Sequence, residues 1–230
     1  MPEVNILAGY PKPTKPRFVG RNMRTINHRL TAVERGENFF DGDRNFGYGG
    51  FNYDGRWLPI ADRIVKHYGL KDSSRVLHLN CEKRFLLNDL KQVKPSLEIF
   101  GTENSDYAIK HAMDEVKNSI KKVSSVELPF PDNFFNFVVG LSYVYTYSLS
   151  DAVKALEEIN RVGTGNSFIT LATYETESEY FLFKDWTLLG TLILKKEEWI
   201  SVMEHAGYEG DYYFIGANSL NLKRLSLIHI

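Results

Sequence analysis

From residue 58 onward, short apolar runs alternate with amphipathic stretches along the chain. The pattern predicts strands at residues 75–79, 97–102, 122–126, 134–141, 167–172 and 212–216, of which 134–141 (FFNFVVGL) has the composition of a buried strand. Stretches of helical period lie around them at residues 58–67, 85–93, 105–118, 151–162 and 197–206. Such alternation favours parallel strands joined by right-handed crossovers. The pattern therefore predicts an α/β fold with a doubly wound, mostly parallel Rossmann-like sheet, which binds ligands beyond the carboxyl ends of its strands.

Residues 1–57 do not follow this alternation, and we interpret them as an N-terminal extension of an α/β domain that spans residues 58–230. A proline-rich stretch at residues 11–16 predicts extended backbone, and residues 22–35 predict a short polar helix. Residues 39–57, the aromatic segment, hold seven aromatic residues and five glycines and fit neither period. This segment is either a surface loop packed by its own rings or a lid over a ligand site. As a lid it would contact substrate through Tyr48, Tyr53, Asp54, Arg56 and Trp57.

Charge and composition narrow the classes of partner. Lys and Arg number 28 against 29 Asp and Glu, which does not give the basic field of a nucleic-acid-binding protein. No apolar run approaches the ~20 residues of a membrane span, so we expect no membrane partner. The single cysteine, Cys81, cannot form an internal disulfide, and the N-terminus lacks the apolar core of a secretory signal. We therefore expect a cytoplasmic protein.

Four phrases of the sequence occur in the order and spacing of one family. They are NSDYAIKHA at residues 104–112, VELPFPDNFFNFVV at 126–139, DAVKALEEINRVGTGNSFITLATY at 151–174 and WISVMEHAGYEGDYYFI at 199–215. With them, the chain from residue 58 onward resembles the class I S-adenosylmethionine-dependent methyltransferase superfamily. The phrase YDGRW at residues 53–57 is similar to one in a bacterial subgroup that acts on small molecules. The resemblance implies a Rossmann-like fold, S-adenosylmethionine as cofactor and methyl transfer.

The loop after the first strand of the domain departs from the pattern of this superfamily. The family has an acidic residue and then glycines, as Asp-x-Gly-x-Gly-x-Gly, because glycines turn tightly and let the backbone approach the cofactor. Here the aligned residues are VLHLNCEKRF, with His78 in place of the acid and Asn80, Glu82 and Arg84 in place of glycines. We expect Glu82 and Arg84 to adopt left-handed backbone poorly, to occupy the space of the cofactor and to pair with each other.

Other aligned positions give a mixed picture. The resemblance assigns Glu103 to the ribose hydroxyls and Ser124 to the adenine edge, where the family has an acid or amide. Each residue also has a structural interpretation. Glu103 would then be a solvated acid at a helix start, His78 a hydrogen-bonded strand-end histidine and Cys81 a packed thiol. We expect no metal site, because His78 and Cys81 are too few ligands.

Residues 173–190 follow the fifth strand of the resemblance and are rich in polar and aromatic groups. They form either an amphipathic helix with a core face or part of a substrate site. Methyl transfer requires in-line geometry and sometimes a general base. Glu175 and Asp185 are candidate bases and Tyr145 a possible donor, but the spacing selects no catalytic residue. Tyr174 and Trp186 complete the candidate substrate contacts, for a small polar sugar, nucleotide-sugar or carboxylate.

Three hypotheses of function follow. The first is a methyltransferase homologue that has lost cofactor binding and binds a small polar metabolite or assembles with an active relative, as a homo- or hetero-oligomer. The second is an active methyltransferase with an altered loop. The third is an enzyme of another reaction class that has recruited His78, Glu82 or Arg84. The first requires an interaction surface if it acts through a partner.

Overall fold

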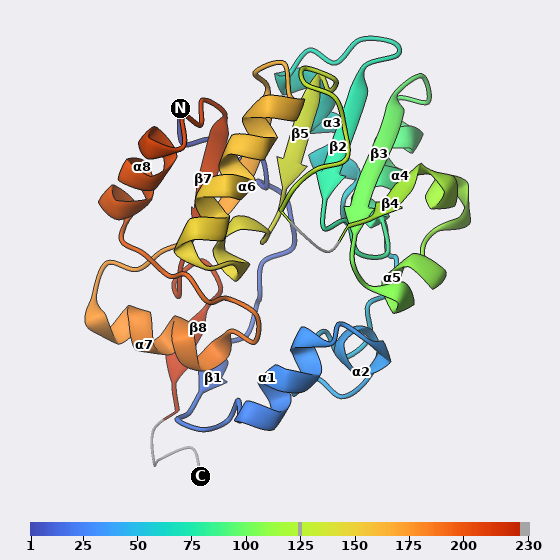
Figure 1. Cartoon of the computed structure of the whole chain (residues 1–230). Coiled ribbons are helices and arrows are strands. Elements are labelled where there is room, and N and C mark those ends of the chain that lie inside the picture. Colours follow the sequence, from blue (N-terminus) through green and yellow to red (C-terminus); the bar gives the residue numbers. More distant parts are fainter. Residues whose placement is uncertain (124–125, 226–230) are drawn as a thin grey trace.

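A six-stranded parallel sheet forms the centre of the molecule in the computed structural model, which describes residues 1–123 and 126–225 (Figure 1). The strand order is β4-β3-β2-β5-β6-β7, and every neighbouring pair is parallel. The strands are β2 (Arg75–Leu79), β3 (Glu98–Glu103), β4 (Ile120–Lys122), β5 (Phe137–Gly140), β6 (Ser167–Ala172) and β7 (Asp211–Ile215). The order reverses between β2 and β5, which confirms the predicted doubly wound sheet and places its switch point at the carboxyl ends of these two strands.

Helices cover both faces of this sheet (Figure 1). One face packs against α3 (Leu58–His67) and α4 (Phe85–Val93). The other packs against α6 (Leu149–Val162) and α8 (Lys196–His205). Successive strand residues alternate between the two cores. Val76, Val139 and Phe168 belong to the α3–α4 side, and Leu77, Val138 and Ile169 belong to the α6–α8 side. This alternation is the period-2 pattern of strands buried on both faces.

The chain after β3 differs from the prediction of one long helix over residues 105–118. Ser105 caps α5 (Asp106–Lys110) as expected, because its hydroxyl accepts from the Ala108 amide at 3.0 Å. The helix then ends, and a 3-10 helix, η1 (Asp114–Ser119), follows. The Met113 amide donates to the Lys83 carbonyl, and Val116 is buried against the α4 side. This tertiary packing overrides the helical period. The strand predicted over residues 122–126 begins at Ile120, and residues 124–125 lie outside the described residues.

The N-terminal extension contributes three elements that lie near the carboxyl ends of the sheet strands (Figure 1). The predicted polar helix is present as α1 (Ile26–Val33), but β1 (Arg17–Val19) and α2 (Glu37–Phe40) were not predicted. β1 pairs in parallel with β8 (Leu222–Arg224) in a separate two-stranded sheet. The extension therefore contacts the C-terminal part of the chain.

Residues 173–190 contain the predicted amphipathic helix, α7 (Glu177–Trp186), with Phe183 in the core. Its first turn carries a capping box between Thr176 and Glu179, which explains where it begins. A short 3-10 helix, η2 (Val144–Thr146), follows β5. Within residues 1–123 and 126–225, no helix is long and apolar enough to cross a bilayer.

Candidate functional site

The loop that follows β2 turns through three left-handed residues that are not glycine. The φ angles are 53° at Asn80, 52° at Glu82 and 71° at Arg84. Our expectation that Glu82 and Arg84 avoid this backbone is wrong. Backbone hydrogen bonds hold the turn: the Cys81 amide donates to the Thr102 carbonyl at 2.9 Å, and the Arg84 amide to the Cys81 carbonyl at 2.8 Å. Left-handed backbone costs each such residue about 1–2 kcal/mol, so the neighbouring contacts must offset this strain.

Glu103 is a buried carboxylate at the carboxyl end of β3, and its side chain is surrounded by donors. It is 1% exposed, which excludes the interpretation as a solvated acid. The backbone amides of Glu82, Asn104 and Ser105 donate to it at 2.7, 2.9 and 2.9 Å. Arg35 Nη2 lies 3.3 and 3.2 Å from its two oxygens. The carboxylate is therefore stabilised by three amide dipoles and one full positive charge.

Arg35 comes from the short connection between α1 and α2, and its guanidinium is buried. It lies 5.5 and 5.6 Å from the ring centroids of Phe39 and Phe40, so aromatic faces flank the cation. Burial alone would lower the pKa of Arg35, but the carboxylates of Glu103 and Glu82 outweigh this effect and raise it. Its Nε has no hydrogen-bond partner among the described residues. Arg35 is thus held mainly by charge.

Glu82 faces the same cluster, and not Arg84 as we expected. Its carboxylate lies 3.9 Å from Arg35 Nη2 and accepts from the Tyr48 hydroxyl at 2.6 Å. Burial raises the pKa of Glu82 to about 7, although Arg35 and Tyr48 partly oppose the shift. The carboxyl group therefore titrates near neutral pH. We name Arg35, Tyr48, Glu82 and Glu103 the carboxylate cluster.

The first part of the aromatic segment is anchored over the loop after β2. Lys83 Nζ donates to both oxygens of Asp41, at 2.8 and 2.6 Å, and to the Phe51 carbonyl at 3.0 Å. The Tyr107 hydroxyl donates to Asp41 Oδ2 at 2.7 Å. The ring of Phe51 stacks on that of Phe85 at the start of α4, with centroids 4.7 Å apart. Residues 39–51 therefore pack over this loop.

The second part of the aromatic segment points elsewhere. The Tyr53 hydroxyl donates to Asp89 Oδ1 on α4 at 2.6 Å. Arg56 pairs with its near neighbour Asp54 at 2.6 Å, and the ring of Trp57 packs on Tyr10. The structure thus leaves these four predicted lid residues outside the carboxylate cluster, because the chain after Phe51 runs along α4 to begin α3.

The candidate residues beyond β6 are held in pairs of their own. Glu175 pairs with Lys196 at 3.2 Å, and Asp185 pairs with Arg224 at 2.7 Å. Tyr174 packs on Tyr180, and Trp186 packs on Phe183. Neither carboxylate contacts the carboxylate cluster, so the structure does not bring the two candidate bases to it. Tyr145 is buried in the α6–α8 core.

His78, Cys81 and Arg84 are buried and lie outside the carboxylate cluster. Burial lowers the pKa of His78 to about 3, and its Nδ1 has no partner among the described residues. Cys81 is a packed thiol whose pKa is raised by burial. Arg84 is fully buried, and only its Nη1 has a partner, the Val116 carbonyl at 3.4 Å.

No group of three His, Cys, Asp or Glu side chains among the described residues could hold a metal ion. The predicted contact Ser124 lies outside the described residues.

Sequence reasoning missed the residues that complete the site from the N-terminal extension. Arg35 was assigned to the end of a polar helix, and Asp41 of the aromatic segment was given no role of its own. Two residues of the domain that contact Asp41, Lys83 and Tyr107, were also missed. The only local signal was the position of Arg35 before Gly36, where a helix commonly ends. No pattern in the sequence indicates that this arginine meets Glu103.

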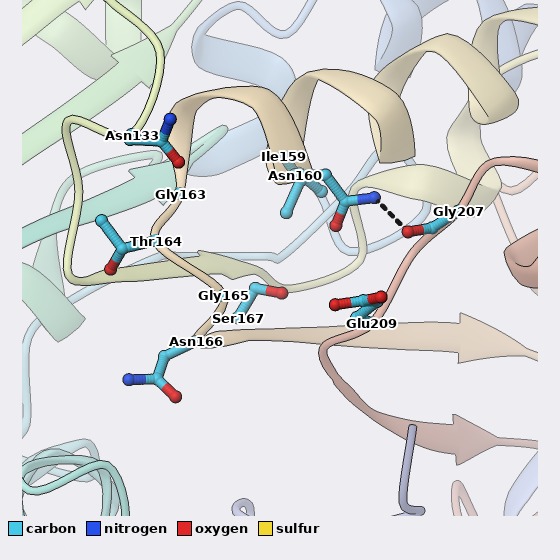
Figure 2. Close-up of a pocket in the computed structure, with 10 residues that line it drawn as sticks. All are labelled: Asn133, Ile159, Asn160, Gly163, Thr164, Gly165, Asn166, Ser167, Gly207 and Glu209. Atoms are coloured by element: carbon cyan, nitrogen blue, oxygen red, sulfur yellow. Dashed lines mark hydrogen bonds between the residues drawn. The ribbon is translucent and has the colours of Figure 1, made fainter.

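A cavity of about 310 Å³ lies at the amino ends of β6 and β7, which is the end of the sheet opposite to the carboxylate cluster (Figure 2). Its lining includes Asn133, Asn160, Asn166 and Ser167, and its one ionisable side chain is Glu209. The Asn160 amide donates to the Gly207 carbonyl across one side of it. The cavity is far along the strands from the carboxylate cluster, and we assign it no catalytic role.

Similarity to known proteins covers the part of the chain that holds this site. Residues 77–170 match the family model described as a methyltransferase domain. This range includes the loop after β2 and Glu103. No curated protein matches the chain.

Several solved structures share the fold. The YcgJ protein of Bacillus subtilis is 16% identical, with a TM-score of 0.54 over 66% of this chain and 68% of that chain. A protein of Bacillus halodurans assigned as a methyltransferase is 15% identical, with a TM-score of 0.52 over 64% and 68%. A Methanococcus maripaludis protein assigned as an S-adenosyl-L-methionine-dependent methyltransferase is 15% identical, with a TM-score of 0.50 over 66% and 76%. At these identities the similarity establishes the fold alone.

Proposed function

We propose, from the premise that this chain belongs to the class I S-adenosylmethionine-dependent methyltransferase superfamily, that it is a non-methylating homologue whose own side chains fill the cofactor site. The observation that carries this proposal is the buried ion pair of Arg35 with Glu103. The resemblance assigns the Glu103 carboxylate to the ribose hydroxyls of the cofactor. In this chain the carboxylate already has a cation and three amides as donors.

A ribose would have to compete with the donors that already occupy the acceptor sites of the Glu103 carboxylate. A carboxylate offers about four lone-pair sites, and the three amides and Arg35 use that number. Displacing Arg35 would leave a buried cation unpaired, which costs about 3–5 kcal/mol. The Glu82 side chain also stands where the family has a glycine, and Tyr48 holds it there. The residues present therefore do not fit the cofactor in the usual arrangement.

The function that remains is binding. The protein would bind a small polar metabolite near the carboxyl ends of the strands, or assemble with an active relative. The hypothesis of a different reaction class relies on His78, Glu82 or Arg84 as a newly recruited active group. Here Glu82 pairs with Arg35 and Tyr48, while His78 is buried and uncharged. That hypothesis has no support from these contacts.

One observation favours the second candidate, an active methyltransferase. The loop after β2 keeps left-handed backbone at all three aligned glycine positions, so the turn itself is preserved. If the N-terminal extension moved, Arg35 and Tyr48 would leave with it. Glu103 would then be free to accept from a ligand.

Isothermal titration calorimetry with S-adenosylmethionine and S-adenosylhomocysteine separates the two candidates. We expect dissociation constants weaker than about 1 mM for the natural chain. Arg35→Ala combined with Glu82→Gly opens the site, and we expect it to strengthen binding if the occupied cluster is the barrier. Arg56→Ala is the matched control, because it removes an exposed arginine of the same extension. Micromolar binding by the natural chain would contradict the proposal.

A further inference from the structure

A second cavity, of about 170 Å³, lies where the N-terminal extension meets the end of α7. Its lining brings together residues that are distant in the sequence. Arg17 comes from β1, Arg24 from the turn before α1 and Arg44 from the aromatic segment. Met23 and Trp186 provide apolar surface in the same lining. None of these residues contacts Glu103 or Glu82, so the cavity is distinct from the carboxylate cluster.

The three arginines form no ion pair with any described carboxylate. Arg24 Nη1 donates to the carbonyls of Arg44 and Asn45, and Arg44 Nη1 donates to the Gly47 carbonyl. No side-chain hydrogen bond from Arg17 is formed among the described residues, and its guanidinium lies 5.8 Å from the ring centroid of Trp186. The acid in the lining, Asp185, is already paired with Arg224 at 2.7 Å.

The positive charges at this cavity act on one another. Burial lowers the pKa of Arg17 and of Arg24, and the charge of Arg44 lowers both further. Asp43 opposes the effect at Arg24. The three like charges repel one another, Asp43 offsets this only in part at Arg24, and a bound anion would relieve the remaining repulsion. Guanidinium groups suit phosphate and carboxylate because their planar donors match these oxygens in pairs.

The volume of the cavity and its apolar side chains limit which group can be attached to the anion. One water needs about 10–15 Å³ of cavity, so about 170 Å³ accommodates a phosphate and a small ring. Trp186 offers a flat face beside Arg17, and Met23 offers an adaptable apolar surface.

We propose that this cavity binds a small ligand that carries a phosphate or carboxylate group on a flat apolar ring. Arg17, Arg24 and Arg44 hold the anion, and Trp186 and Met23 contact the ring. The site is independent of the proposed function, because it uses other residues.

Calorimetry of the full chain at low salt tests the site with phenyl phosphate, benzoate, inorganic phosphate and benzyl alcohol. We expect phenyl phosphate or benzoate to bind, and whichever is tighter identifies the anion. Inorganic phosphate should bind about tenfold more weakly than phenyl phosphate if that ester is the tighter ligand, and benzyl alcohol should not bind. Equal affinity of inorganic and phenyl phosphate overturns the role of the ring. Failure of both ring anions to bind more tightly than about 10 mM overturns the site.

Two variants separate specific binding from general attraction. Arg17→Gln should weaken the tighter ring anion by about tenfold or more, because it removes a guanidinium that faces the cavity. Lys15→Gln removes the same charge two residues away, from an exposed position outside the lining, and should weaken binding by less than about twofold. Equal losses in both variants overturn the site. The thermal midpoint of each variant verifies its fold, and Arg44→Gln replaces Arg17→Gln if the latter unfolds.

Discussion

Arg35 and Glu103 are buried opposite charges that lie 68 positions apart in the chain. Each would be costly to bury alone, and each compensates the charge of the other. Three backbone amides donate to Glu103 and stabilise its negative charge further. Glu82 adds a second carboxylate beside the same guanidinium. Because two carboxylates compete for one cation in a place with little water, the protonation of Glu82 is the variable part of the cluster.

Glu82→Gln tests whether the protonation of Glu82 changes the stability of the protein with pH. The pKa of Glu82 rises from 4.5 to about 7 on folding, so the folded state binds the proton more tightly. The contribution of Glu82 to the free energy of unfolding is therefore full below pH 4.5 and is lost as the pH rises through 7. This loss should be on the order of 3 kcal/mol and should disappear in Glu82→Gln. Urea unfolding between pH 4.5 and 8 measures it.

Glu175→Gln serves as the control, because Glu175 pairs with Lys196 at the surface. Its pH dependence should match that of the natural chain. An unchanged pH dependence in Glu82→Gln would show that another group titrates in this window.

At the scale of elements, the aromatic segment is held over the loop after β2 by two kinds of contact. Lys83 ties Asp41 and the Phe51 carbonyl to the loop. Rings from both sides then stack, with Phe51 between Tyr48 and Phe85. Gly47 lies in the turn between these anchors, and a Cβ there would come 1.9 Å from the Phe39 carbonyl oxygen. The segment can therefore close only with glycine at this position.

Gly47→Ala should move the aromatic segment away from the loop. We expect a loss of about 1–3 kcal/mol in the free energy of unfolding and faster amide hydrogen exchange at residues 39–51. Gly36→Ala is the matched control, because nothing lies within 4 Å of its added Cβ and its φ of −86° suits alanine. Equal exchange at residues 39–51 in both variants would show that the segment is not fixed by this contact.

At the scale of the whole molecule, three of the contacts that join the N-terminal extension to the domain illustrate how the two parts pack together. The first is Ile6, which is 1% exposed and belongs to the core under α3. The second is the parallel pairing of β1 with β8, and the third is the carboxylate cluster. The boundary that we predicted at residue 57 thus separates two patterns in the sequence, while the side chains on either side of it pack together.

Ile6→Ala tests whether the extension contributes to the stability of the whole chain. Truncation of a fully buried isoleucine costs about 2–5 kcal/mol, and we expect the thermal midpoint to fall accordingly. Ile26→Ala is the matched control, because Ile26 is 72% exposed on α1 and its truncation should change little. Similar midpoints for the two variants would mean that residues near Ile6 fold separately from the domain.

Local patterns were sufficient for the central strands and for most of the helices that cover the sheet. Burial on both faces makes a strand such as Phe137–Gly140 continuously apolar, and a helix such as 151–162 has one apolar side. They failed for residues 105–118, where Met113 and Val116 pack inward against the loop and the α4 side. They also failed for β1 and β8, which are short strands that pair only with each other.

The sequence by itself determined the α/β class, the order of the main elements and the unusual residues of the loop after β2, since these depend on short-range periodicity and on residue type. Only the tertiary structure decided what those residues contact. A left-handed turn holds Glu82 beside Arg35, and a segment 68 positions earlier in the chain brings that arginine to Glu103. Such long-range pairing leaves no periodic pattern in the sequence, because the two charged residues meet through the folding of the chain and not through a fixed separation along it.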